Sequence, residues 1–111
     1  MSANMSLSSQ QVRALRAESH RLKLKPVVMI GQHGLSENVI NELELSLAHH
    51  ELIKIRIPAL DKLEKKELID TICQKLQAES VQTIGHITVL FRQNPKIKRF
   101  AKVLRPKATD S

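Results

Sequence analysis

Two glycines, three residues apart, follow a short apolar run and precede a helical pattern. The apolar run ends at Ile30, the glycines are Gly31 and Gly34, and Ser36 stands where it can cap the helix. Glycine permits a positive φ and a close approach by another backbone. A helix start presents unpaired N–H groups and the positive end of its dipole, which suits a phosphate. The G-x-x-G loop therefore predicts a phosphate-binding site, although a plain strand-to-helix turn shows the same spacing.

Side chains that could support catalysis or bind a metal occur without the partners that such chemistry needs. The five histidines have no cysteine or carboxylate at a recognised ligand spacing. The sequence contains no Walker loop, nucleophile elbow or HExxH motif. Ser36 lies near His33, but its position favours a helix cap over a nucleophile. We expect no catalysis, metal or other cofactor, and a small hydrolase with His33 as its base stays an alternative.

Basic side chains are concentrated at the two ends of the chain, which has a net charge of +7. Residues 1–35 hold five lysines and arginines against one glutamate, and residues 92–111 hold seven against one aspartate. Residues 36–51 hold four glutamates and neither lysine nor arginine. Positive regions of this kind attract polyanions, and nucleic acid is favoured over an anionic membrane surface.

Hydrophobic spacing predicts one domain at residues 7–94, followed by a basic C-terminal tail at 95–111 with weak helical periodicity. The expected helices span about 8–22, 36–50 and 61–79, and the expected strands span 27–30, 52–57, 81–84 and 87–92. The order α-β-α-β-α-β-β predicts three parallel strands joined by right-handed crossovers, with a final antiparallel strand. The strand at 27–30 is apolar without alternation, which predicts an interior position covered partly on both faces.

The remaining composition favours a cytoplasmic protein. Cys73 is the single cysteine, and it lies on an apolar helical stripe that predicts a place in the core. No apolar run is long enough to span a membrane, and residues 1–9 lack a secretory leader pattern. The chain has no Trp or Tyr, so an aromatic platform for stacked bases is not expected. Contacts with RNA would then rest on phosphate, ribose and shape.

Residues 25–36, Lys-Pro-Val-Val-Met-Ile-Gly-Gln-His-Gly-Leu-Ser, resemble the signature of the CRM domain, the chloroplast RNA splicing and ribosome maturation module. The similarity covers about 7–93 and includes the strand at 52–57 and the hairpin at 84–92, as in free-standing bacterial YhbY-type members. It implies an α/β fold: a two-layer αβ sandwich with a mixed four-stranded sheet, like the C-terminal domain of translation initiation factor 3. It also implies RNA binding through the loop, as in KH domains, and association with precursors of the large ribosomal subunit.

One departure from that family concerns the loop itself, where Gln32 and His33 stand at positions that carry lysine or arginine in many members. Flanking residues must then supply the positive charge. We predict a non-enzymatic RNA-binding module that acts as a ribosome assembly factor; a monomer is favoured, and the sequence leaves the oligomeric state open. The predicted RNA-binding residues are Lys23, Lys25, Gly31, Gln32, His33, Gly34, Ser36, Arg92, Lys96, Lys98 and Arg99. The alternative is a protein adapter whose acidic second helix docks a basic ribosomal protein.

Overall fold

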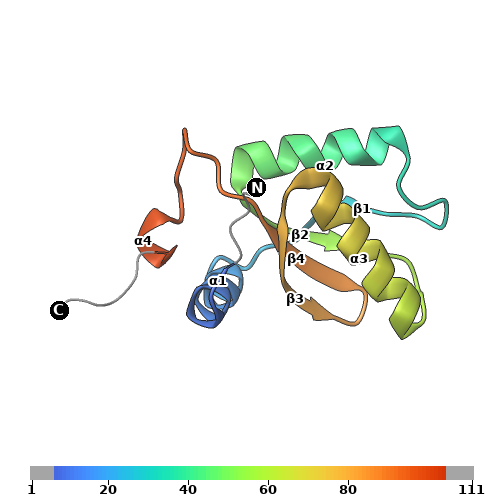
Figure 1. Cartoon of the computed structure of the whole chain (residues 1–111), viewed down its shortest axis with the longest axis horizontal. Helices are drawn as coiled ribbons and strands as arrows, with labels where there is room; N and C mark the ends of the chain where they lie inside the picture. The colour runs from blue at the N-terminus through green and yellow to red at the C-terminus, as the bar shows by residue number, and fades with distance from the viewer. Residues whose placement is uncertain (1–6, 105–111) are drawn as a thin grey trace.

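The computed structural model describes residues 7–104, and its elements follow the predicted order up to the last strand. The elements are α1 (Ser9–Arg21), β1 (Pro26–Met29), α2 (Glu37–His50), β2 (Leu52–Arg56), α3 (Lys62–Leu76), β3 (Glu79–Ile84), β4 (Ile87–Phe91) and α4 (Ala101–Leu104) (Figure 1). In the described part of the chain no helix has the length and apolar character needed to cross a membrane.

The four strands form one mixed sheet in the order β1-β2-β4-β3. β1 pairs with β2 in parallel, and β4 pairs in antiparallel fashion with both β2 and β3. The first three strands therefore run in the same direction, as predicted, and β4 enters the sheet between β2 and β3. The predicted mixed four-stranded sheet is confirmed.

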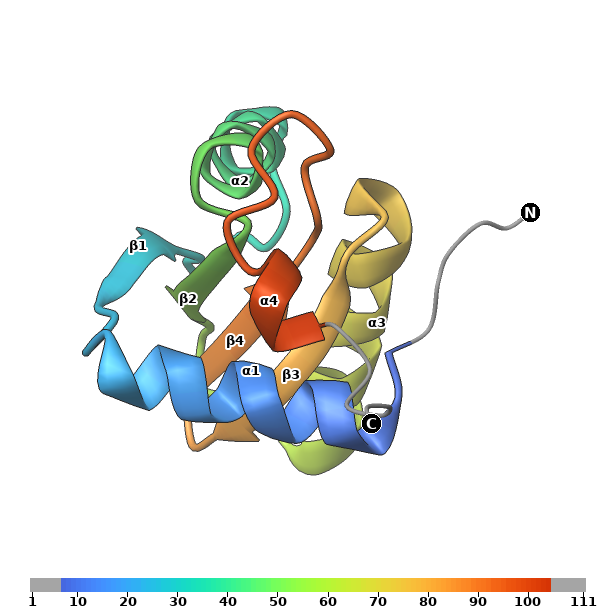
Figure 2. The same cartoon turned by 90° about the vertical axis from the view of Figure 1, so that its left-hand side faces the viewer.

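Helices lie on both faces of this sheet (Figure 2). α2 and α3 cover one face, where Ile53, Ile55 and Ile57 form the centre of the larger core cluster. The buried isoleucines alternate with the less buried Lys54 and Arg56, which is the pattern of a strand with one face on a core. α1 crosses part of the opposite face, where Leu15 and Phe91 belong to a second cluster of buried side chains.

The predicted interior position of the first strand is wrong, because β1 is an edge strand that pairs only with β2. Val28 and Ile30 are buried under α2 and α3, whereas the side chains of Val27 and Met29 are 50% and 65% exposed. An unbroken apolar run does not distinguish a strand that is covered on both faces from an edge strand with apolar residues on its open face. The exposed pair therefore requires another explanation than core packing.

The helix starts follow the sequence, whereas one helix end does not. Ser8 with Gln11, and Asp61 with Glu64, form capping boxes at the predicted starts of α1 and α3. The third helix ends at Leu76 rather than near residue 79, because Gln77 adopts a left-handed conformation with φ of 57°. That early end releases residues 79–84 to form β3.

Residues 95–104, which the sequence assigns to the basic tail, fold back onto α1 and the sheet. Phe100 is buried and lies edge-on to Phe91, with ring centroids 6.1 Å apart. Gln11 Nε2 donates a hydrogen bond to the carbonyl oxygen of Leu104, and the two atoms are 2.9 Å apart. The packing thus continues beyond the predicted boundary at residue 94, and the rest of the tail lies outside the described residues.

Cys73 packs against the larger core cluster and is half-buried. Burial, with smaller effects from Glu79 and Asp70, raises the pKa of its thiol to about 11. Because the thiolate is the reactive form, we expect alkylation at pH 8 to be at least roughly a hundredfold slower in the native protein than in urea. Rates of iodoacetamide labelling measure this, and equal rates in the two states would contradict the placement of α3.

Candidate nucleic-acid interface

The G-x-x-G loop projects from the end of the sheet between β1 and α2 (Figure 1). The N–H group of Gly34 donates to the carbonyl oxygen of Gly31 at 3.0 Å, which closes a turn. Gly34 has a φ of +78°, a conformation that other residues rarely adopt. Gly31 lacks such a φ, and a Cβ added there would meet no described atom within 4 Å. The turn requires a glycine at position 34, but the fold does not require one at position 31.

Ser36 caps α2, as predicted. Its Oγ accepts a hydrogen bond from the N–H of Val39 at 3.2 Å, and its own N–H donates to the carbonyl oxygen of Gly34. The N–H groups of Glu37 and Asn38 belong to the first turn and point out of the helix start. These two groups, rather than the amide of Ser36, are available to an anion, although the carboxylate of Glu37 lies in the same turn.

The predicted RNA-binding residues separate into two groups at opposite ends of the sheet. Gln32 and His33 are exposed in the loop, beyond the last residue of β1. Lys23 and Lys25 precede β1 and are also exposed. Since a strand rises about 3.3 Å per residue, Lys25 and Gly31 are separated by roughly 20 Å of extended chain. The two lysines that were expected to supply positive charge to the loop therefore lie far from it.

The predicted C-terminal residues also lie at the end opposite the loop. β4 ends at Phe91, which pairs with Leu52, the first residue of β2. Lys96, Lys98 and Arg99 follow, and all three are exposed. Because β2 is five residues long, the two ends of the sheet are roughly 15 Å apart.

Arg92 has a structural role in the fold. Its guanidinium donates to both carboxylate oxygens of Glu44, at 2.7 and 2.8 Å, and to the carbonyl oxygen of Leu76 at 3.0 Å. The hydrogen bond from Arg92, and more weakly its charge, lowers the pKa of Glu44 below its ordinary value, while burial opposes this. Arg92 thereby joins β4 to α2 and α3, and much of its charge is already neutralised.

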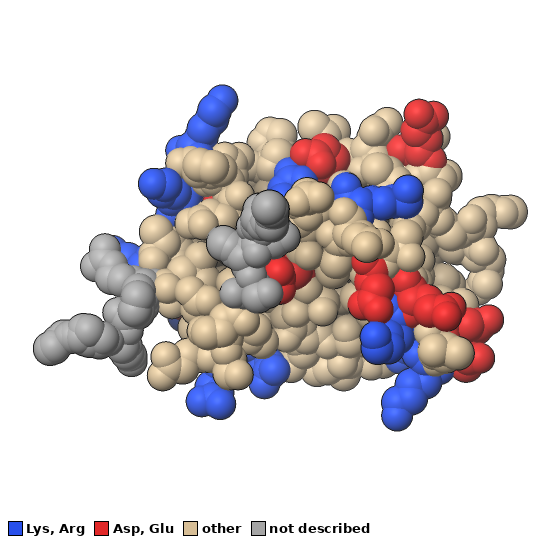
Figure 3. Space-filling view, in the orientation of Figure 1, with Lys and Arg blue, Asp and Glu red and all other residues tan. Residues whose placement is uncertain are grey.

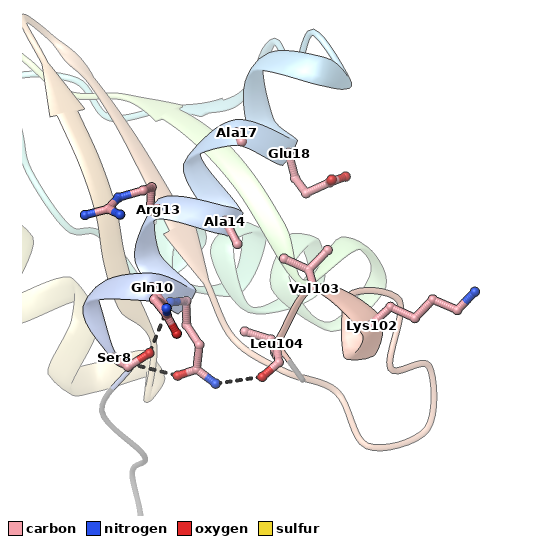
Figure 4. A pocket seen from close by; sticks show the side chains of 10 residues that line it. Ser8, Gln10, Arg13, Ala14, Ala17, Glu18, Lys102, Val103 and Leu104 are labelled. Carbon is pink, nitrogen blue, oxygen red and sulfur yellow. Dashed lines mark hydrogen bonds between the residues drawn. The ribbon is translucent and has the colours of Figure 1, made fainter. Parts of the chain in front are cut away.

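An open hollow lies between α1 and α4, and its lining carries two basic side chains and one acidic side chain, Glu18 (Figure 4). The lining includes Ala14, Ala17 and Val103, and the side chains of Arg13 and Lys102 lie at its margins. Arg13, Arg16 and His20 lie along one side of α1 and are all exposed. The hollow lies at the same end of the molecule as Lys96, Lys98 and Arg99.

Arg56 is a cation beside the loop that the sequence interpretation did not assign to the site. It pairs in register with Met29, and its carbonyl oxygen accepts a hydrogen bond from the N–H of Ile30 at 2.8 Å. Its side chain is exposed. The alternation of β2 correctly predicts that this side chain faces away from the core, but only the parallel pairing with β1 brings it next to Gly31.

Charge is distributed unequally between the helices and the strands. Figure 3 shows acidic side chains over α2 and α3. These two helices carry six exposed acidic residues against four lysines, all four on α3; the acidic residues are Glu37, Glu42, Glu44, Glu64, Glu67 and Asp70. The strands carry Lys54 and Arg56, and Glu79 is their single acidic residue. Among residues 7–104, no three histidine, cysteine or acidic side chains are grouped so as to hold a metal. The open face of the sheet therefore suits an anionic ligand better than the helical face does.

A model of the CRS1 / YhbY (CRM) domain matches residues 7–92. A protein of Haemophilus influenzae, named as an RNA-binding protein, is 44% identical over 92 residues, which cover 83% of this chain and 91% of that protein. A protein of Pseudomonas aeruginosa, named as a probable RNA-binding protein, is 34% identical over 106 residues, which cover 89% of this chain and all of that protein.

The fold is also similar to a solution structure from Staphylococcus aureus, described as that of a hypothetical protein and candidate RNA-binding protein. The TM-score is 0.70 at 34% sequence identity, and the match covers 80% of this chain and 91% of that one. The relatives are thus similar to this chain over nearly their whole length.

Proposed function

Because the chain belongs to the CRS1 / YhbY (CRM) domain family, we propose that it binds RNA and that the G-x-x-G loop contacts the phosphate backbone. The observation that carries this proposal is the glycine at position 31. The turn needs Gly34 for its positive φ, whereas Gly31 has an ordinary φ and open space around it. A glycine that the fold does not need, beside a helix start, is explained by a ligand backbone that approaches closely.

The loop and its neighbours supply different parts of the binding energy. The N–H groups of Glu37 and Asn38 and the side chains of Gln32 and His33 donate hydrogen bonds to phosphate and ribose. The exposed guanidinium of Arg56 provides the full positive charge that the loop lacks. Such contacts position an RNA without reading its sequence.

The cations at the other end of the sheet act on a different part of the RNA. The Debye length at physiological ionic strength is about 8 Å, and the two ends are roughly 15 Å apart. Lys23, Lys25 and the group of Lys96, Lys98 and Arg99 therefore attract an RNA that is long enough to reach them. An RNA that occupies only the loop gains little from them.

We further infer that the bound RNA belongs to precursors of the large ribosomal subunit, and that the protein is a cytoplasmic assembly factor rather than an enzyme. The support for this step is the resemblance to ribosome maturation modules. Crosslinking in growing cells, followed by sequencing of the attached RNA, tests it directly. We expect reads concentrated in large-subunit ribosomal RNA, and an even spread over messenger RNA would contradict the inference.

The acidic outer face of α2 supports the adapter alternative. Glu37 and Glu42 are exposed there, and Leu45 is an apolar side chain that is 60% exposed beside them. A basic ribosomal protein could dock on this surface. Association with ribosomal particles that survives nuclease treatment would support the adapter, and its loss on treatment would support RNA binding.

The salt dependence of binding should distinguish the cations at the C-terminal end of the domain from those beside the loop. Replacing Lys96, Lys98 and Arg99 by glutamine should reduce the slope of log affinity against log salt by about 2 for a long single-stranded RNA, at about 0.7 per phosphate. A short oligonucleotide should show little change. The control replaces the exposed Lys62, Lys66 and Lys75 of α3, which removes the same charge from the helical face. Equal slopes in the two variants would exclude the C-terminal segment from the interface.

A further inference from the structure

We propose that unpaired RNA held at the loop continues across a row of four outward-facing side chains, one from each strand of the sheet. The row consists of Met29, Arg56, Ile87 and Ile84, and we call it the terminal row. This inference rests on the proposed RNA-binding function and assigns it a second contact surface and a class of RNA.

The register of the sheet places these four residues side by side. Met29 pairs with Arg56, Arg56 pairs with Ile87, and Ile87 pairs with Ile84. Strands lie about 4.8 Å apart, so the row spans about 14 Å across the sheet. Val28 and Ile55, the residues just before Met29 and Arg56, belong to the core under α2 and α3. Since successive side chains alternate between faces, the terminal row lies on the opposite face.

α1 covers the other end of that face and leaves the terminal row open. Leu15 of α1 packs with Leu52 and Phe91, two residues that pair with each other far from Met29. The side chains of Met29 and Ile84 are 65% and 61% exposed. Figure 1 shows the loop and the turn between β3 and β4 at the end of the molecule away from α1 and α4. The row thus forms an exposed surface that begins two residues before Gly31.

The chemistry of the row suits an unpaired nucleic acid strand. Single exposed apolar residues are common, but here two exposed ones, Met29 and Ile84, share a row with the partly exposed Ile87 and an arginine. Glu79, the acidic residue of the strands, pairs with Phe91 at the opposite end. An apolar surface can contact base faces, and a cation can neutralise the backbone that connects them. A duplex hides its base faces, so the terminal row should favour single-stranded over double-stranded RNA.

The test replaces the two most exposed apolar residues of the row by serine, as the double variant Met29→Ser/Ile84→Ser. We expect its affinity for a short single-stranded oligonucleotide to fall about tenfold with an unchanged salt slope, because apolar contacts release no counterions. Arg56→Gln should instead reduce the slope by about 0.7. The matched control, Leu45→Ser/Leu63→Ser, removes side chains of similar exposure, 60% and 64%, from the helices, and should bind like the wild type.

The possible outcomes separate this inference from the proposed function. Wild-type affinity and slope in both row variants, together with loss of binding in a loop variant, would overturn the terminal row and leave RNA binding intact. Wild-type protein that binds no RNA would overturn both. Equal losses for single-stranded and duplex RNA would overturn the preference for unpaired strands. Retained RNA binding with loss of a protein partner would reassign the row to that partner.

Discussion

The variant Gly31→Asp is expected to bind single-stranded RNA about tenfold more weakly than the wild type, with an unchanged free energy of unfolding. A side chain at this position meets no described atom within 4 Å and requires no unusual φ, so the fold should accept it. A carboxylate within about 5 Å of a phosphate costs on the order of 1 kcal/mol in water and more where solvent is excluded. About 1.4 kcal/mol corresponds to a tenfold change in affinity. An RNA titration at fixed salt, beside a denaturant melt, measures both quantities.

Three further variants show how much of this loss of affinity comes from the added charge, from the size of the side chain and from backbone strain. Gly31→Asn has nearly the same shape without the charge and should lose less affinity. Asn41→Asp adds the same charge to an exposed position on α2 and should bind normally. Adding Gly34→Asp should abolish binding, at some cost in stability because position 34 has a positive φ. Normal RNA binding by a folded Gly31→Asp variant would show that the loop is only a turn.

Features of this fold that depend on local sequence could be predicted. The capping pairs Ser8–Gln11 and Asp61–Glu64 are three residues apart, and each places a side chain on a backbone group of the same turn. The alternating isoleucines of β2 require only that one face of the strand be buried. The turn at Gly31 to Gly34 is local as well, which is why the candidate loop was found from its spacing.

Features that depend on which strands become neighbours could not be predicted in the same way. The edge position of β1 follows from the pairing of β4 with β2, which no local pattern specifies. The parallel pairing of β1 with β2 places the loop beside Arg56, and the antiparallel pairing of β4 with β2 carries Lys96, Lys98 and Arg99 to the other end of the sheet. The charge along the chain could therefore predict an RNA-binding protein, but it could not predict where on the folded surface the cations lie.

The docking of residues 94–104 depends on a buried carboxylate that sequence patterns did not single out. Glu51 is fully buried at the end of α2, and its carboxylate accepts hydrogen bonds from the N–H groups of Asn94 and Arg99. Its own carbonyl oxygen accepts a hydrogen bond from Arg92. In the sequence, Glu51 is one of four glutamates in an acidic stretch. Its function becomes visible only when the chain 43 residues later returns to it.

The variant Glu51→Ala is expected to lower the free energy of unfolding by about 3 kcal/mol and to release residues 94–104 from the domain. A hydrogen bond to a charged group contributes about 1.5–3 kcal/mol, and two partly buried N–H groups would lose their acceptor. Urea melts measure the change in stability. Hydrogen exchange at the amides of Asn94 and Arg99, and at Leu104, whose N–H donates to Phe100, should become much faster than in the wild type.

Two control variants distinguish the loss of the buried carboxylate from a change in backbone strain and from the simple loss of a negative charge. Glu51 has a φ of 63° and a ψ of −47°, an unfavourable conformation for any residue with a Cβ. Glu51→Gly should therefore be about 1 kcal/mol more stable than Glu51→Ala while it releases the segment equally. Glu44→Gln removes a carboxylate that is half exposed in its pair with Arg92, and it should cost less than about 1 kcal/mol. Glu51→Ala could lose no more stability than Glu44→Gln, with the amide of Leu104 exchanging as slowly as in the wild type. That result would show that the buried carboxylate does not hold the segment. The cluster of Phe91 and Phe100 would then be the main contact that holds it, beside the hydrogen bond from Gln11 to Leu104, and Phe100→Ala would become the variant that releases it.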